Sequence, residues 1–282
     1  MNTRARLAAL IAGLAIVVAA VPQAASAQGA YQRPSTPQRV PSGTSTNQKA
    51  SGDEKKAEAV FTQLLSTGQD DVTNHQFADG VQAYEQAVKV GESLYGAHDA
   101  RLVPALSGIV YAQMSWDTYA SMAGGKKGDV GDAVKAQERV VKIYDDDGVD
   151  AKTRVGSMID LGDVYSYTDN ERALDTYRNA WQLQSTLDSA DSADALFAKP
   201  GVVRLQLPPN PSGHEEWVAT VHYDVGADGK ATVSAVDGNQ PESLASAIRT
   251  SYENGRFRPR FVGGEPVATT GLNSSHKYIA TK

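Results

Sequence analysis

The sequence predicts an α+β protein with two domains, an all-α helical-repeat domain at residues 53–197 and a smaller α+β domain at 198–282. The first prediction depends on small and aromatic residues that recur at helical spacing through the middle of the chain. The second depends on two runs of alternating apolar and polar residues joined by an Asp-Gly pair, a typical hairpin pattern. An amphipathic helical pattern follows the hairpin and completes the smaller domain.

The chain begins with the pattern of a secretory signal peptide. Arg4 and Arg6 precede an apolar run at 7–21, and Ala25-Ser26-Ala27 supply a cleavage site of the small-x-small type. We therefore expect residues 1–27 to be removed during export to the periplasm. An uncleaved inner-membrane anchor is the alternative. A membrane-spanning helix needs about 20 apolar residues, and this run is shorter.

Composition excludes several classes of site. The sequence has no Cys, which excludes disulfides, thiolate metal ligands and a lipoprotein attachment site. Residues 53–197 hold 13 basic and 25 acidic side chains, a net charge of −12, whereas residues 198–282 hold 9 and 8, a net charge of +1. No basic patch indicates nucleic-acid binding, and no second apolar run indicates a membrane span. Residues 28–52 have almost no large apolar side chain, so we expect a disordered linker there.

The middle region repeats one pattern of helix contacts. Three segments share a template of small residue, larger residue and small residue: Gly80-Tyr84-Ala87, Ala133-Gln137-Val140 and Ala173-Tyr177-Ala180. Two others share a Gly-x2-Tyr step, Gly108 to Tyr111 and Gly162 to Tyr165. The pattern resembles tetratricopeptide repeats, in which small residues lie where paired helices cross. We expect Tyr84, Tyr165 and Tyr177 to fill the gaps beside them; a plain irregular helical bundle is the alternative.

The final quarter of the chain contains four ordered motifs. A hairpin turns at Asp228-Gly229, a helix follows at 241–252, and then come Phe257-x-Pro259 and Gly264-x-Pro266-Val267 before a closing segment. This order resembles the C-terminal domain of the TonB family of energy transducers, which implies a hairpin-helix-strand fold. Phe257 should then anchor the core against the helix, and Pro259 should end the strand pairing. An unrelated hairpin-helix module is the alternative.

Two positions depart from the family pattern. Gly255 stands where the family usually has a large aromatic residue before the Phe-x-Pro step. The closing segment at 269–275 is polar and contains Gly271, which is expected to weaken a strand. The resemblance therefore favours the fold of a TonB domain more than its activity as a transducer.

Three arginines form a candidate partner-binding site. Arg256, Arg258 and Arg260 alternate with Phe257, Pro259 and Phe261. On a strand, this alternation would place the three guanidinium groups on one face, where they could bind a carboxylate-bearing partner. A solvated sheet edge is the alternative, because outward charges also discourage aggregation.

Other candidate sites are weaker. The Asp145-Asp146-Asp147-Gly148 run lacks the ligand positions of a calcium loop and is expected to be a helix end capped by glycine. The five histidines form no metal-binding pair by spacing, although His222 could approach His276 across a sheet. No nucleophile elbow, Walker loop or dinucleotide fingerprint is present, so we predict no catalytic residues, metal or cofactor.

The two resemblances together imply a non-catalytic protein that binds other proteins in the envelope of a Gram-negative cell. The expected partner is a protein or peptide, such as a receptor or complex of TonB-dependent transport. A TonB-type transducer retained at the inner membrane is one alternative. An envelope enzyme, with acids gathered from distant helices, is another.

Overall fold

A computed structural model of the protein describes residues 52–123, 125–211 and 216–279. These residues form an α+β protein with a helical N-terminal part and small sheets, as the sequence predicts. They divide into two compact units: a helical unit of residues 52–196 with Gly263–Glu265, and a C-terminal unit of Phe197–Val262 with residues 266–279. The predicted signal peptide at 1–27 and all of the linker except Gly52 lie outside the described residues.

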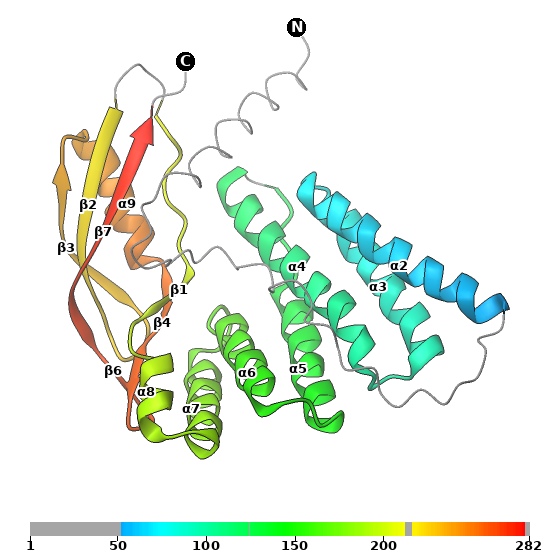
Figure 1. Cartoon of the computed structure of the whole chain (residues 1–282). Helices are drawn as coiled ribbons and strands as arrows, with labels where there is room; N and C mark the ends of the chain where they lie inside the picture. Colours follow the sequence, from blue (N-terminus) through cyan, green and yellow to red (C-terminus); the bar gives the residue numbers. More distant parts are fainter. Residues whose placement is uncertain (1–51, 124, 212–215, 280–282) are drawn as a thin grey trace, which may run out of the picture. The chain divides into compact units, whose positions relative to one another are not determined.

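The helical unit is a series of antiparallel helices in which each helix packs against the next along the chain (Figure 1). Helices α3 and α4 are joined through a short 3-10 turn at Ala100–Leu102. The helices are α2 (Gly52–Thr73), α3 (Phe77–Tyr95), α4 (Val103–Ala123), α5 (Val130–Asp146), α6 (Ala151–Tyr165), α7 (Asn170–Leu187) and α8 (Ala190–Leu196).

Three of these helices begin at an aspartate that caps them. Asp129, Asp150 and Asp169 each accept a hydrogen bond from the backbone N–H three residues later, at 3.2, 3.0 and 3.1 Å. A carboxylate in this position satisfies an N–H group that has no partner inside the helix and lies favourably at the positive end of the helix dipole. The caps fix where α5, α6 and α7 begin.

Glycine and tyrosine meet where the helices cross. Tyr84 of α3 is 5% exposed, and its ring lies against Gly68 of α2 and Gly108 of α4. Tyr177 of α7 is 1% exposed, and its ring lies against Gly162 of α6. A side chain at any of these glycines would collide with the neighbouring ring. The close approach of each helix pair therefore needs a residue without a side chain.

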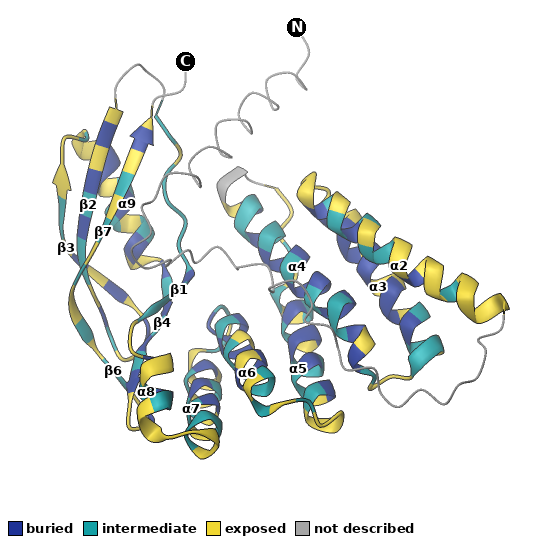
Figure 2. Ribbon diagram, viewed as in Figure 1, coloured by how far each residue is buried: buried dark blue, intermediate teal, exposed yellow. Residues whose placement is uncertain are grey.

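Helix α4 is enclosed by its neighbours. From Val103 to Ala120 it has no exposed residue, and Figure 2 shows few exposed positions along it, in contrast to the exposed outer stripe of α2. Leu102, Ala105, Val110, Ala112 and Met114 are buried in the core of the helical unit.

The C-terminal unit consists of one three-stranded antiparallel sheet, α9 and two small ribbons. The sheet has the strand order β3-β2-β7, and α9 packs against β3 and β2. The ribbons pair β1 with β4 and β5 with β6. The elements are β1 (Gly201–Arg204), β2 (Glu216–Val225), β3 (Ala231–Gly238), α9 (Glu242–Glu253), β4 (Arg256–Arg258), β5 (Arg260–Val262), β6 (Glu265–Val267) and β7 (Thr269–Ile279).

The predicted hairpin and helix are present. Strands β2 and β3 pair from Val225↔Ala231 outward, and Gly229 takes a positive φ of 73° in the turn between them. Helix α9 begins after Pro241, and its buried face of Leu244, Ile248 and Tyr252 packs on the sheet. Phe257 is 3% exposed and joins this core.

One prediction from the sequence is wrong. The arginine run at 256–260 is not one strand, because Pro259 separates β4 from β5 and the two strands belong to different ribbons. Proline has no N–H group to continue a strand ladder. The polar closing segment forms the 11-residue strand β7, and Gly271, at φ 69°, lies in an irregularity of its pairing with β2.

Candidate functional site

Strand β7 forms one edge of the three-stranded sheet. Among the strands that the structure describes, β7 pairs with β2 alone, so its second edge carries backbone groups without a strand partner. The register runs from Glu216↔Ile279 to Val225↔Thr269. At the irregularity, the backbone N–H of Gly271 donates to Asp224 Oδ1 at 2.8 Å. An edge strand of this length is a template for strand addition.

The two faces of β7 differ. On the face towards α9, Tyr278 is buried and the Tyr252 hydroxyl lies 2.6 Å from His276 Nε2. On the opposite face, Lys277 forms an ion pair with Glu216 at 2.5 Å, and the Ser275 hydroxyl lies 3.0 Å from that of Thr220. These contacts hold β7 against β2 and α9, and none of the described strands pairs with its second edge.

Burial controls the protonation of His276. It lowers the pKa of the imidazole to about 4 and raises the pKa of the Tyr252 hydroxyl to about 12. At neutral pH the imidazole is therefore neutral, and its tautomer decides whether Nε2 or the Tyr252 hydroxyl donates the hydrogen bond. The two histidines do not approach each other, because His222 Nε2 lies 3.1 Å from Asp237 Oδ2 on the opposite face of the sheet.

The ribbon of β1 and β4 brings together a different set of arginines from the predicted one. Arg204 and Arg256 are directly opposite each other, and Arg258 lies opposite Gly201. The pairing has a register shift between Val202 and Arg204, so regular alternation places only Arg256 and Arg258, two apart on β4, on one face. Arg260 lies on β5, in the other ribbon. Arg204 was not predicted, because 52 positions separate it from Arg256 in the sequence.

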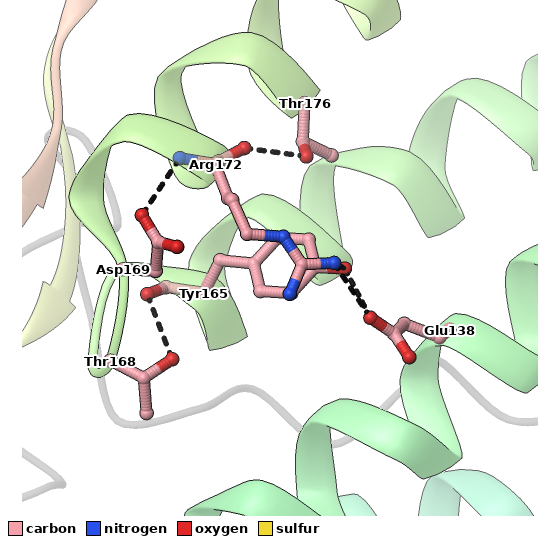
Figure 3. Close-up of polar contacts among 6 residues, drawn as sticks. All are labelled: Glu138, Tyr165, Thr168, Asp169, Arg172 and Thr176. Atoms are coloured by element: carbon pink, nitrogen blue, oxygen red, sulfur yellow. Dashed lines mark hydrogen bonds and ion pairs between the residues drawn. The ribbon is translucent and has the colours of Figure 1, made fainter.

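The helical unit holds a polar cluster at the α5–α6–α7 junction (Figure 3). The Tyr165 hydroxyl donates to Glu138 Oε1 at 2.5 Å and accepts from Arg172, whose guanidinium carbon lies 4.0 Å from the ring centroid. Burial and then the bond to Glu138 raise the pKa of Tyr165 to about 12. Tyr165 is only 4% exposed, and its contacts with Glu138 and Arg172 join three helices.

The acidic run at the end of α5 forms contacts within the helical unit. Asp145 pairs with Arg154 at 2.6 Å, Asp146 Oδ2 lies 2.9 Å from His98 Nδ1, and Asp147 accepts from the backbone N–H of Ala100 at 2.8 Å. Gly148 follows with a positive φ of 61°. The prediction of a helix end capped by glycine is confirmed.

In residues 52–123, 125–211 and 216–279, no three His, Cys, Asp or Glu side chains are arranged to hold a metal ion. His214 lies outside the described residues. Within those residues, no helix is both long and apolar enough to cross a membrane.

No protein-family model matches this sequence, and no similar curated protein is found. The likeness to tetratricopeptide repeats and to TonB domains is therefore a resemblance of motifs and of element order. The features that bear most directly on function are the edge of β7 that no described strand pairs with and the arginines of the β1–β4 ribbon.

Proposed function

We propose that the protein is a non-catalytic adaptor of a Gram-negative envelope that binds protein segments in the periplasm. The observation that carries the proposal is the open edge of β7, an 11-residue strand bonded to β2 on one side. An extended segment can add to such an edge through main-chain hydrogen bonds, while side chains on either face select the sequence. We assign this binding to TonB-dependent transport.

The arrangement of both units supports the proposal. The order of hairpin, helix and closing strand in the C-terminal unit is the order of a TonB domain. In the helical unit, the Gly68–Tyr84 and Gly162–Tyr177 contacts are those that a tetratricopeptide-like helix pair requires. Stacked helix pairs of this kind are protein-binding scaffolds. We therefore assign the helical unit to partner binding as well.

A site-specific crosslink tests the edge. A photoreactive amino acid at Thr270, exposed on β7, should capture a partner in living cells, and the partner should be identified by mass spectrometry. The double variant Asn273→Lys and Ser275→Lys should abolish this adduct, because lysines on an edge strand oppose strand addition. The matched control, Thr232→Lys and Ser234→Lys, places the same charges on exposed positions of the other edge strand and should leave the adduct intact.

Equal adducts from both double variants would show that β7 is not the binding edge. The same cells test the location. Exported protein should begin at Gln28, and an intact N-terminus at Met1 in the membrane fraction would contradict a periplasmic adaptor.

A further inference from the structure

The helical unit holds a short segment that lies far along the chain from its helices. Gly263–Glu265 belong to this unit, and Gly263 follows Asp194 of α8 by 69 positions. The segment includes the tight turn between the paired strands β5 and β6. Gly263 and Gly264 take φ values of 59° and 84°, which is the conformation of a two-residue hairpin turn. Helices α7 and α8 therefore contact a β-turn as well as each other.

An indole ring forms the floor beneath this turn. A Cβ atom on Gly264 would lie 3.1 Å from Cε3 and 3.2 Å from Cζ3 of Trp181, and Gly264 itself is buried. Any side chain at this position would press against the ring, and the positive φ also disfavours one. The close packing of the turn on Trp181 therefore favours glycine as the second residue of the turn.

One carboxylate holds both the ring and the turn. Asp194 Oδ1 accepts from Trp181 Nε1 at 2.8 Å and from the backbone N–H of Gly263 at 3.0 Å. Hydrogen bonds to an ionised carboxylate are stronger than those between neutral groups. Because the second donor is a main-chain group, this bond recognises the conformation of the turn and not a particular side chain.

An arginine adds a preference for an acidic residue after the two glycines. Arg178 precedes Trp181 by three positions on α7, and its Nη2 lies 3.2 Å from Glu265 Oε2. Its Nη1 lies 2.6 Å from Asp175 Oδ1, and this second pair orients the guanidinium. The side chains of Arg178 and Glu265 are 30% and 68% exposed, so their pair contributes little free energy. It serves to select the sequence of the turn more than to raise affinity.

The contact is small enough to exchange. Gly263 and Glu265 are exposed, so only one of the three residues is buried. Segments with few buried contacts open at a small cost in free energy. A second turn of the same chemistry would then find the indole, the carboxylate and the guanidinium in place. While the chain's own turn is seated, it competes at an effective concentration of about millimolar.

We infer that the α7–α8 surface formed by Arg178, Trp181 and Asp194 binds a Gly-Gly-acid β-turn of a partner protein. Gly263–Glu265 of the chain itself block this surface until a partner's turn replaces them. The inference rests on the proposed adaptor function and names one kind of segment that the adaptor binds. It does not depend on strand addition, because the three side chains belong to α7 and α8.

The test uses the full exported chain and a fluorescent, backbone-cyclised hairpin peptide that carries residues 260–267. Gly264→Val in the chain should unseat its own turn, because valine disfavours the positive φ and meets the Trp181 ring. Fluorescence anisotropy should then show a peptide affinity at least about tenfold higher than that of the native chain, since the competing turn is gone. Trp181→Leu added to Gly264→Val should abolish the binding.

Gly96→Val is the matched control, because Gly96 has a similar φ of 93° in the same unit and its Cβ position has no atom within 4 Å. It should leave the affinity of the native chain unchanged. If Gly264→Val does not fold, Glu265→Gln serves, since it removes only the exposed ion pair and should raise affinity up to about fivefold.

Equal affinities of the native chain and the variants at Gly264 and Glu265, or no binding to any of them, would show that the turn only packs against its own helices. Crosslinking at Thr270 reports on the edge strand separately, so a failure of either experiment leaves the other result standing.

Discussion

Acid should destabilise the C-terminal unit through His276. In the folded protein, burial lowers the pKa of this imidazole from 6.5 to about 4. The unfolded chain therefore binds a proton at a higher pH than the folded chain does. Above pH 6.5 both states are neutral and His276 has no effect on stability. As the pH falls below 6.5, the unfolded state gains a proton first, so stability is lost progressively until the pH reaches about 4.

The size of the effect follows from the two pKa values. A pKa difference of one corresponds to 1.36 kcal/mol, so a fall from 6.5 to about 4 gives a full loss of about 3 kcal/mol. At pH 5, where most carboxylates are still ionised, the loss should be about 2 kcal/mol. That is a large part of the stability of a small domain.

Urea unfolding at pH 7.5 and pH 5 measures this loss. Incorporated 5-fluorotryptophan gives one fluorine signal for each of the three tryptophans, and the signal of Trp217 reports on the C-terminal unit. His276→Gln keeps a side chain that can donate to or accept from the Tyr252 hydroxyl, and it should remove the extra loss at pH 5. His222→Gln, on the opposite face, should keep it. If the native protein and His276→Gln lose the same stability between the two pH values, the imidazole is not the acid-sensitive group.

Three further substitutions test the packing. Gly162→Ala should destabilise the helical unit by about 1–3 kcal/mol because its Cβ meets the Tyr177 ring. Gly156 lies in the same helix, and a Cβ atom there would meet no other atom within 4 Å, so Gly156→Ala should stabilise the unit by about 1 kcal/mol. Thermal unfolding followed by far-UV circular dichroism measures the opposite effects of the two substitutions. Phe257→Ala should lower the free energy of unfolding of the C-terminal unit by about 3–5 kcal/mol. The Trp217 fluorine signal should then report unfolding at a lower urea concentration. An unchanged midpoint would contradict the place of Phe257 in the core.

The elements that depend on contacts between near neighbours in the chain could be predicted from the sequence. The Asp228-Gly229 pair fixes the hairpin because glycine adopts the positive φ of the turn, and Pro241 marks the start of α9. The residues that fill the helix crossings could also be located, since Tyr84 and Tyr177 follow the spacing of a helix pair. The partner of Tyr84 in α2, Gly68, was missed, although it precedes Tyr84 by nearly the interval that separates Gly162 from Tyr177.

The candidate sites depend on contacts that sequence spacing does not encode. Arg204 meets Arg256 only because β1 pairs with β4, and no local pattern gives that register. In β7, apolar and polar residues do not alternate regularly, yet the strand forms because its inward residues face α9. The irregularity at Gly271 accommodates the shift in its register with β2. The bond between Tyr252 and His276 likewise joins two segments that only the folded sheet brings together.

The enclosure of α4 has a consequence for how the helical unit assembles. From Val103 to Ala120 no residue of α4 is exposed, so an intermediate in which α4 is formed but only half covered would leave much apolar surface in water. The helices before and after it must dock in the same cooperative step, and α4 should be the last segment to exchange its amide hydrogens with solvent. Removing α2 and α3 would uncover the apolar side of α4, so a truncated chain should aggregate rather than persist as a shorter array.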